Sequence, residues 1–222
     1  MKRVIRSLAD IPDQVPIFPL AGALLLPRMV LPLNIFEPRY LAMVDHALAG
    51  DRLIGVIQPA IEPGGATAEG DSPPLSGIGT IGRITHFEER PDNRYLIGLM
   101  GIIRFNLASE VESFAPFRKA EVECAPFESD FEEGHGEEDV DRHAFLAALR
   151  DYADFAEFEI DWDDVTAMSV EDLVNSCVMA SPYGPRERQA LLETSTLRER
   201  AEMLTALAEV EMSRSAPGRN LQ

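Results

Sequence analysis

The sequence predicts an α+β protein in which a β-rich first half precedes a helical second half. Before residue 125, short apolar runs alternate with Gly and Pro turns, a pattern typical of strands joined by tight connections. After residue 139, apolar residues recur at helical spacing. The stretch between them is polar and acidic, which favours a linker. We therefore expect three parts: a β-rich part (1–125), an acidic linker (126–139) and a helical part (140–222).

Prolines shape the start of the β-rich part. They occur at positions 16, 19, 27 and 32, and each removes a backbone donor that a central strand would need, so short, kinked or edge strands are expected there. Pro38 suits the first turn of a helix because its φ is already set. Leu41, Val44, Ala47 and Leu48 follow at helical spacing and Gly50 is a natural stop.

Further strands are predicted after this helix. They cover residues 53–57, 78–87, 95–100, 102–107 and 118–124, with a turn at 91–93 and an exposed loop over 59–76. Consecutive strands joined by turns indicate an antiparallel sheet or a small barrel. We expect such a sheet to make up most of the first half.

Helix signals dominate the second half. Apolar residues at 145, 149, 152 and 156 share one helix face. Ser169 is a candidate N-cap, and Gly184-Pro185 begins another helix. Thr196 with Glu199 three residues later forms a capping-box pattern at the start of the last helix. These signals predict a helical bundle.

The net charge of −18 is concentrated in the middle of the 222-residue chain. Residues 120–172 carry 19 acidic side chains and only two basic ones. Nucleic acids and anionic lipids attract clustered Lys and Arg, so binding to either is not expected. The acidic stretch is read as a solvated linker and helix face, with an acidic docking surface for a basic partner as the alternative. No apolar run is long enough for a transmembrane helix or a signal peptide, and two cysteines form no disulfide framework, so a cytoplasmic location is expected.

Catalytic and cofactor motifs are mostly absent from the sequence. Residues 77–82 match G-x-G-x-x-G but run into a predicted strand, whereas a dinucleotide site needs a helix there. The sequence has neither a P-loop nor a G-x-S-x-G elbow. Histidines and cysteines lack the spacing of metal ligands; they are His46, His86, His135, His143, Cys124 and Cys177. We expect no catalytic residue, cofactor or metal site.

Several segments in order resemble the N-terminal substrate-binding domain of Lon protease, in particular its stand-alone bacterial members. The resemblance is carried by Val15 to Leu20, Leu24 to Pro27 and Leu31 to Tyr40, followed by Gly79-Thr80 with Ile84, Gly101 with Arg104-Phe105, and Gln189 to Glu193 with Arg200. It extends over about residues 14–210. It implies a PUA-like β pseudo-barrel followed by a C-terminal helical bundle, without the ATPase and Ser–Lys peptidase modules of full-length Lon.

The resemblance implies a non-catalytic module that recognises exposed apolar segments of client proteins. Candidate partners are unfolded or partly unfolded protein segments and a separate protease or chaperone; the oligomeric state is left open. Leu26, Met29 and Tyr40 are the candidate client-binding residues, because a proline corner turns some apolar side chains outward. A small hydrolase with an unrecognised site and, with less support, a PUA-like RNA-binding protein are the alternatives.

Two positions of the resembling segments carry specific expectations. Phe36 is expected to pack inward at the corner before the helix, with a groove formed by Tyr40 as the alternative. The family often has glycine after Pro27, whereas this chain has Arg28. A residue other than glycine is strained at positive φ, so Arg28 is expected to adopt a different turn or to place a cation at the barrel rim.

Overall fold

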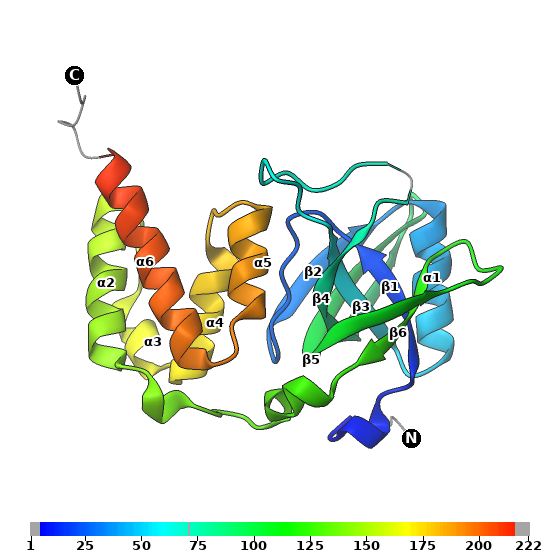
Figure 1. Ribbon diagram of the computed structural model, residues 1–222, viewed down its shortest axis with the longest axis horizontal. Coiled ribbons are helices and arrows are strands. Elements are labelled where there is room, and N and C mark those ends of the chain that lie inside the picture. The colour runs from blue at the N-terminus through cyan, green and yellow to red at the C-terminus, as the bar shows by residue number, and fades with distance from the viewer. Residues whose placement is uncertain (1–4, 71, 216–222) are drawn as a thin grey trace. The chain divides into compact units, whose positions relative to one another are not determined.

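The computed structural model describes residues 5–70 and 72–215, and in them it confirms the α+β class (Figure 1). The strands are β1 (Gln14–Pro19), β2 (Val30–Ile35), β3 (Leu53–Pro59), β4 (Leu75–Arg90), β5 (Arg94–Val111) and β6 (Lys119–Glu123). The α-helices are α1 (Pro38–Ala49), α2 (Arg142–Ala156), α3 (Trp162–Ala167), α4 (Val170–Ala180), α5 (Pro185–Glu193) and α6 (Leu197–Ser215). Short 3₁₀ helices are η1 (Leu8–Asp10), η2 (Ala125–Phe131) and η3 (Glu137–Asp139).

The six strands form one mixed sheet in the order β2-β5-β4-β3-β1-β6. β1 and β3 are parallel and the other pairs are antiparallel. The long β5 pairs with β2 through residues 95–100 and with β6 through residues 106–111. The β5–β6 pairing closes a ring of five strands, while β2 stays outside that ring on the first half of β5. The result is a pseudo-barrel rather than a clean barrel.

Apolar side chains pack on both faces of the sheet and form two clusters, because neighbouring residues of a strand face opposite sides. In β3, Ile54 and Val56 belong to the cluster that includes α1, whereas Leu53 and Ile57 belong to the cluster that includes η2. Figure 1 shows α1 lying against one side of the strands. The predicted helix over this segment is confirmed: Pro38 is its first residue and Gly50 its C-cap.

The G-x-G-x-x-G match lies inside β4 and opens no helix, so its glycines serve strand packing. A Cβ at Gly79 would lie 2.5 Å from the Val56 carbonyl oxygen, and one at Gly82 would lie 2.5 Å from Leu99 Cγ. Both distances are shorter than van der Waals contact. These positions lack a side chain because neighbouring strands and side chains occupy the space it would need.

The turn after Pro27 keeps the left-handed conformation despite its arginine. Arg28 has φ 66°, so the expectation of a different turn is wrong. Its backbone N–H donates to the Gly101 carbonyl at 2.8 Å, and its guanidinium donates to the Asp130 carbonyl at 2.6 Å. These two hydrogen bonds offset the strain of positive φ, which is about 1–2 kcal/mol for a residue with a Cβ.

We expect Arg28→Gly to be more stable than Arg28→Ala, the reverse of the usual order. Both changes remove the hydrogen bond to the Asp130 carbonyl, but only glycine relieves the positive φ, by about 1 kcal/mol. Urea unfolding of the two variants measures the difference. Equal stability, or a more stable alanine variant, would show that the turn carries no such strain.

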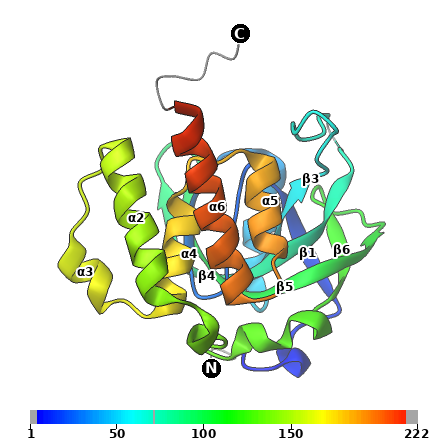
Figure 2. The same ribbon diagram turned by 60° about the vertical axis from the view of Figure 1, so that its left-hand side comes forward.

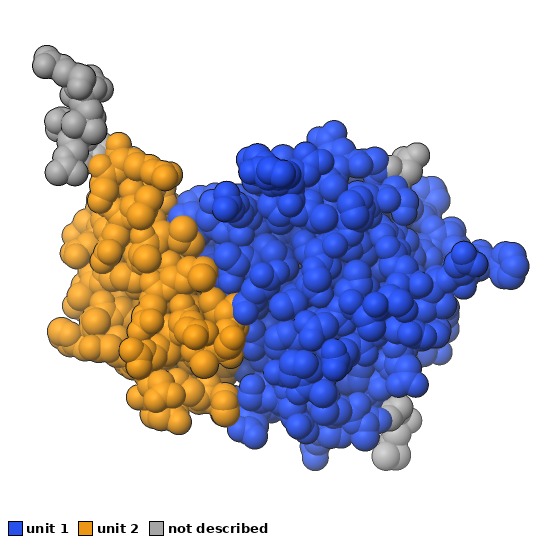
Figure 3. Space-filling model, in the orientation of Figure 1, with its two compact units in different colours: residues 1–133, 181–193 blue, residues 134–180, 194–222 orange. Residues whose placement is uncertain are grey.

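The chain is divided into two compact units (Figure 3). Unit 1 comprises residues 1–133 and 181–193, and unit 2 comprises residues 134–180 and 194–222. The sheet, α1, η2 and α5 therefore belong together, although the sequence ranges assign α5 to the helical part. The stretch assigned to the acidic linker likewise begins in unit 1, where Phe127 and Asp130 are buried.

Polar side chains fasten α5 to the sheet within unit 1. Gln58 donates to Gln189 Oε1 at 3.0 Å and accepts from the Gly22 N–H at 3.0 Å. Gln189 donates to the Ile78 carbonyl at 3.0 Å, and Arg188 donates to the Gly22 carbonyl at 3.0 Å. Gln58 and Gln189 are almost completely buried, so losing either partner would leave an unsatisfied amide.

Unit 2 holds α2, α3, α4 and α6, and its predicted caps are confirmed. Ser169 Oγ accepts from the Asp172 N–H at 3.0 Å. Thr196 and Glu199 form the reciprocal capping box, with distances of 3.1 and 3.2 Å. The buried Arg200 donates to Asn175 Oδ1 at 2.9 Å and so ties α6 to α4. Across the residues that the structure covers, none of the helices has the length and apolar character needed to cross a bilayer.

Candidate functional site

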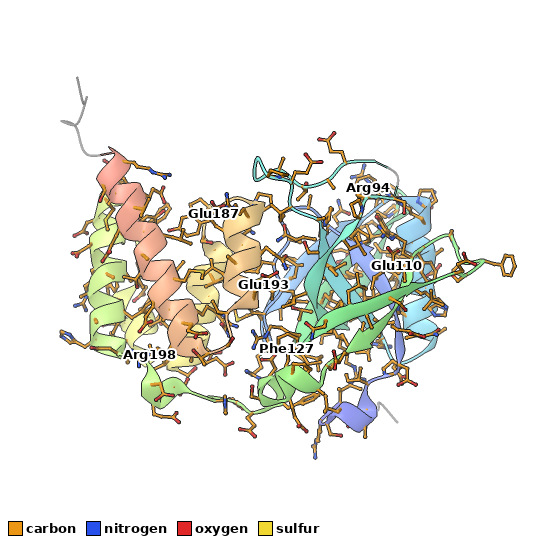
Figure 4. All side chains as sticks on the ribbon, viewed as in Figure 1. Arg94, Glu110, Phe127, Glu187, Glu193 and Arg198 are labelled. Atoms are coloured by element: carbon orange, nitrogen blue, oxygen red, sulfur yellow. The ribbon has the colours of Figure 1, made fainter. Side chains whose placement is uncertain are left out.

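The corner between β2 and α1 presents an exposed aromatic side chain. Ile35 ends β2 and is buried, Glu37 is the N-cap of α1, and its carbonyl accepts from the Tyr40 N–H at 2.9 Å. Phe36 between them is 61% exposed, so the expectation that it packs inward is wrong. Its ring has the Arg94 guanidinium 5.9 Å from its centre, and Arg94, labelled in Figure 4, is the first residue of β5.

Two cavities flank this corner and share three lining residues, Pro19, Arg39 and Tyr40. The first, of about 270 Å3, lies on the β2 side and is also lined by Leu33 and Phe36. The second, of about 290 Å3, extends toward the loop between β3 and β4. It is completed by Ala21, Pro59, Ala68, Gly70, Ser72, Pro73, Pro116, Phe117 and Arg118. We call the two together the corner groove.

Tyr40 forms the shared wall of the corner groove and is held on both sides. Its ring lies 4.4 Å from that of Phe18, centre to centre, and 4.6 Å from the Arg39 guanidinium. Arg39 Nε in turn donates to Glu37 at 2.9 Å. Burial raises the pKa of Tyr40, and Arg39 and Arg118 oppose that shift. The phenol is thus neutral at physiological pH, which leaves an uncharged aromatic wall.

The three predicted client-binding residues lie in different environments. Leu26 has no exposed surface, and its carbonyl accepts from the Met29 N–H at 3.1 Å. Met29 is half-buried and lines neither cavity. Tyr40 is 8% exposed and lines both. The structure therefore brings only Tyr40 to the corner groove.

Sequence reasoning missed the far wall of the groove, because its residues are distant in the chain. Phe117 and Arg118 precede β6, about 80 residues after Tyr40, and no local pattern marks them. Arg118 donates through Nε to Glu110 at 2.7 Å and through Nη1 to the Pro73 carbonyl at 2.9 Å. Glu110, labelled in Figure 4, lies near the end of β5. These bonds hold the loop over 59–76 against the strand and give the groove a fixed edge.

Both cysteine thiols lie in environments that disfavour the reactive thiolate. Burial raises the pKa of the Cys124 thiol to about 12 and that of the Cys177 thiol to about 11, so both are unreactive thiols at neutral pH. Within 5–70 and 72–215, no three His, Cys, Asp or Glu side chains are grouped to hold a metal ion. The groove thus offers apolar, aromatic and arginine surface for binding.

A pseudo-barrel with an aromatic groove at a strand-to-helix corner defines an α+β binding domain. The family model of the ATP-dependent protease La (LON) substrate-binding domain matches residues 14–209. The chain belongs to this family, which confirms the resemblance read from the Ile35 to Tyr40 segment and its neighbours. The match covers the substrate-binding domain and not a catalytic domain.

Relatives and solved structures agree with this membership. The Lon protease of Dictyoglomus thermophilum is 25% identical over 211 residues, which are 92% of this chain and 25% of that protein. Lon protease 2 of Sorangium cellulosum is 32% identical over 118 residues, or 51% of this chain and 14% of that one. The chain thus spans about a quarter or less of these two relatives.

Two solved structures share the fold. The Lon N-terminal domain protein from Xanthomonas campestris has a TM-score of 0.59 at 22% identity, with 87% of this chain and 97% of that one covered. The N-terminal domain of Mycobacterium avium complex Lon protease has a TM-score of 0.63 at 18% identity, with 88% and 98% covered. At these identities, the likeness concerns the fold alone.

Proposed function

We propose that this substrate-binding module recognises exposed apolar segments of client proteins, and that it does so through the corner groove. The observation that carries the proposal is the exposed Phe36 beside two cavities that share Tyr40. An exposed aromatic ring next to a groove is a common anchor of protein-binding surfaces. Met29 and Leu26 act in this proposal through the turn that supports the neighbouring strand, and not as contact residues.

The chemistry of the groove favours unfolded segments over folded partners. Prolines, alanines and aromatic rings supply most of its lining, and Arg39 and Arg118 already pair with Glu37 and Glu110. A site with paired charges selects an apolar side chain rather than an ion. Two adjacent cavities of about 270 and 290 Å3 suit two successive bulky residues of an extended chain.

The proposal includes no catalysis by this chain. Purified protein is expected to hydrolyse neither ATP nor casein, and either activity, proved intrinsic, would favour the hydrolase alternative. A separate protease or a chaperone is the proposed recipient of a bound client. The cytoplasm is the proposed location, and nucleic acid is not a proposed partner because the acidic chain would repel phosphate.

Phe36→Ser is expected to weaken binding of fluorescein-labelled β-casein, an unfolded protein, about tenfold. The ring is 61% exposed, so its removal should not change folding. Fluorescence anisotropy measures the affinity and a melting curve checks the fold.

Phe114→Ser is the matched control, since Phe114 is fully exposed in the same unit and lines neither cavity. Unchanged casein binding by folded Phe36→Ser would overturn the proposed site. An equal loss in the Phe114 variant would show that any exposed ring has this effect.

A further inference from the structure

Unit 2 has a groove of its own, of about 520 Å3, between the first half of α2 and α6. Figures 1 and 2 show these two helices side by side. The floor of the groove is apolar and consists largely of small side chains: Val140, Ala144, Phe145, Ala201 and Ala206. Small residues on both walls let the backbone of a third helix approach closely, as in helix-in-groove recognition.

The rim of this α2–α6 groove is strongly acidic. Four carboxylates line it, those of Asp139, Asp141, Glu202 and Glu209, against the single cation of Arg198. Arg198 is already paired with Glu202 at 2.7 Å, and Figure 4 shows it near the start of α6. Three negative charges of the rim are therefore not balanced by a cation of the rim itself.

The charge of the surrounding unit has the same sign. Residues 134–180 and 194–222 together carry 17 acidic and six basic side chains. Such a field attracts a cationic partner and repels an anionic one. A partner that fits must therefore combine an apolar stripe for the floor with positive charge for the rim.

Aromatic rings extend this surface along α2. Ala144, Ala148 and Phe155 are spaced so that they lie on one side of the helix. Phe155 is 39% exposed, and its ring centre lies 6.1 Å from that of Tyr152, whose hydroxyl donates to Glu211 of α6 at 3.0 Å. Beyond the residues that line the groove, α2 thus offers an aromatic contact that would fix the register of a bound helix.

From these observations we infer that the α2–α6 groove docks a basic amphipathic helix of a partner protein. Leu or Ala side chains of that helix lie on the alanine floor, and its Lys or Arg side chains meet the carboxylate rim. This surface is separate in sequence from the corner groove, so the inference holds whether or not Phe36 binds clients.

The test uses an 18-residue amphipathic peptide of Lys, Leu and Ala, labelled with fluorescein, and the chain of 222 residues. We expect saturable binding that weakens as salt is raised from 50 to about 300 mM, because charge attraction is screened. The same peptide with Glu in place of Lys should not bind. Equal binding of the two peptides would overturn the basic character of the partner.

Variants locate the site. Glu209→Lys and Ala206→Trp are each expected to weaken binding of the Lys peptide about tenfold, the first by charge and the second by filling the groove. Both residues are exposed, and a melting curve checks each fold. Asp154→Lys makes the same charge change at an exposed position of α2 that does not line the groove.

Asp154→Lys should therefore bind the peptide within about twofold of the unchanged protein. A loss in this control equal to that of Glu209→Lys would show attraction to the whole acidic unit and overturn the assigned groove. Full binding by both groove variants would overturn it as well.

Discussion

Asp130→Ala is expected to destabilise unit 1 by about 3–5 kcal/mol, because it removes the carboxylate that pairs with the buried Arg104. Asp130 accepts from Arg104 Nη2 at 2.8 Å, from Nε at 2.9 Å and from the Arg104 backbone N–H at 2.9 Å. The Arg104 guanidinium also donates to the Leu192 carbonyl of α5 at 3.1 Å and lies 4.8 Å from the Phe127 ring centre. The pair thus joins β5, η2 and α5.

An exposed ion pair of the same unit serves as the control. Glu88 pairs with Arg90 at 3.3 Å, and both side chains are almost half exposed. Glu88→Ala should change the free energy of unfolding by less than about 0.5 kcal/mol. Urea unfolding measures both variants; a similar small effect for Asp130→Ala would mean that water replaces the lost carboxylate.

Gly101→Ala is expected to destabilise the protein by about 3 kcal/mol through a clash in the sheet. A Cβ at this position would overlap the Leu26 carbonyl oxygen and approach Leu25 Cγ to 3.3 Å. β5 cannot move away to relieve this clash, because the Gly101 N–H donates to the Met29 carbonyl at 2.8 Å and the Gly101 carbonyl accepts from the Arg28 N–H.

Gly77→Ala is the matched control for this clash. Gly77 lies on the neighbouring β4, and a Cβ added there would meet no atom within 4 Å. We expect the stability of this variant to stay within about 0.5 kcal/mol of that of the unchanged protein. A loss of equal size at both positions would indicate a general intolerance of side chains on these strands rather than the contact with Leu26.

Features with a local cause could be predicted from the sequence. Helix ends depend on residues within three or four positions of one another, and the sequence marks them at Pro38, Gly50, Ser169 and the Thr196–Glu199 pair. The structure has the expected helix boundary or capping hydrogen bond at each of these positions. The α+β class follows from the change in apolar period along the chain. The corner before α1 also stands out in the sequence, since its proline and aromatic residues are close together.

Features that depend on distant residues could not be predicted in this way. Arg104 meets Asp130 across 26 positions, and Gln58 meets Gln189 across 131, so no short pattern joins them. A bulky aromatic residue at a proline corner favours an inward Phe36, but the buried Ile35 precedes it, and neighbouring residues of an extended chain face opposite sides, which leaves the ring outward. The stretch over 126–139 resembles a linker because its acidic residues conceal the buried Phe127 and Asp130.

The placement of α5 has a consequence for how the chain can be divided. Because residues 181–193 belong to unit 1 while the segments on either side belong to unit 2, the backbone passes between the units three times. A single protease cut near residue 134 would leave α5 on the C-terminal fragment, still bonded to the sheet through Gln189 and Leu192. Such a nicked protein should elute as one species until denaturant is added, and an N-terminal fragment expressed alone would lack one of its own structural elements.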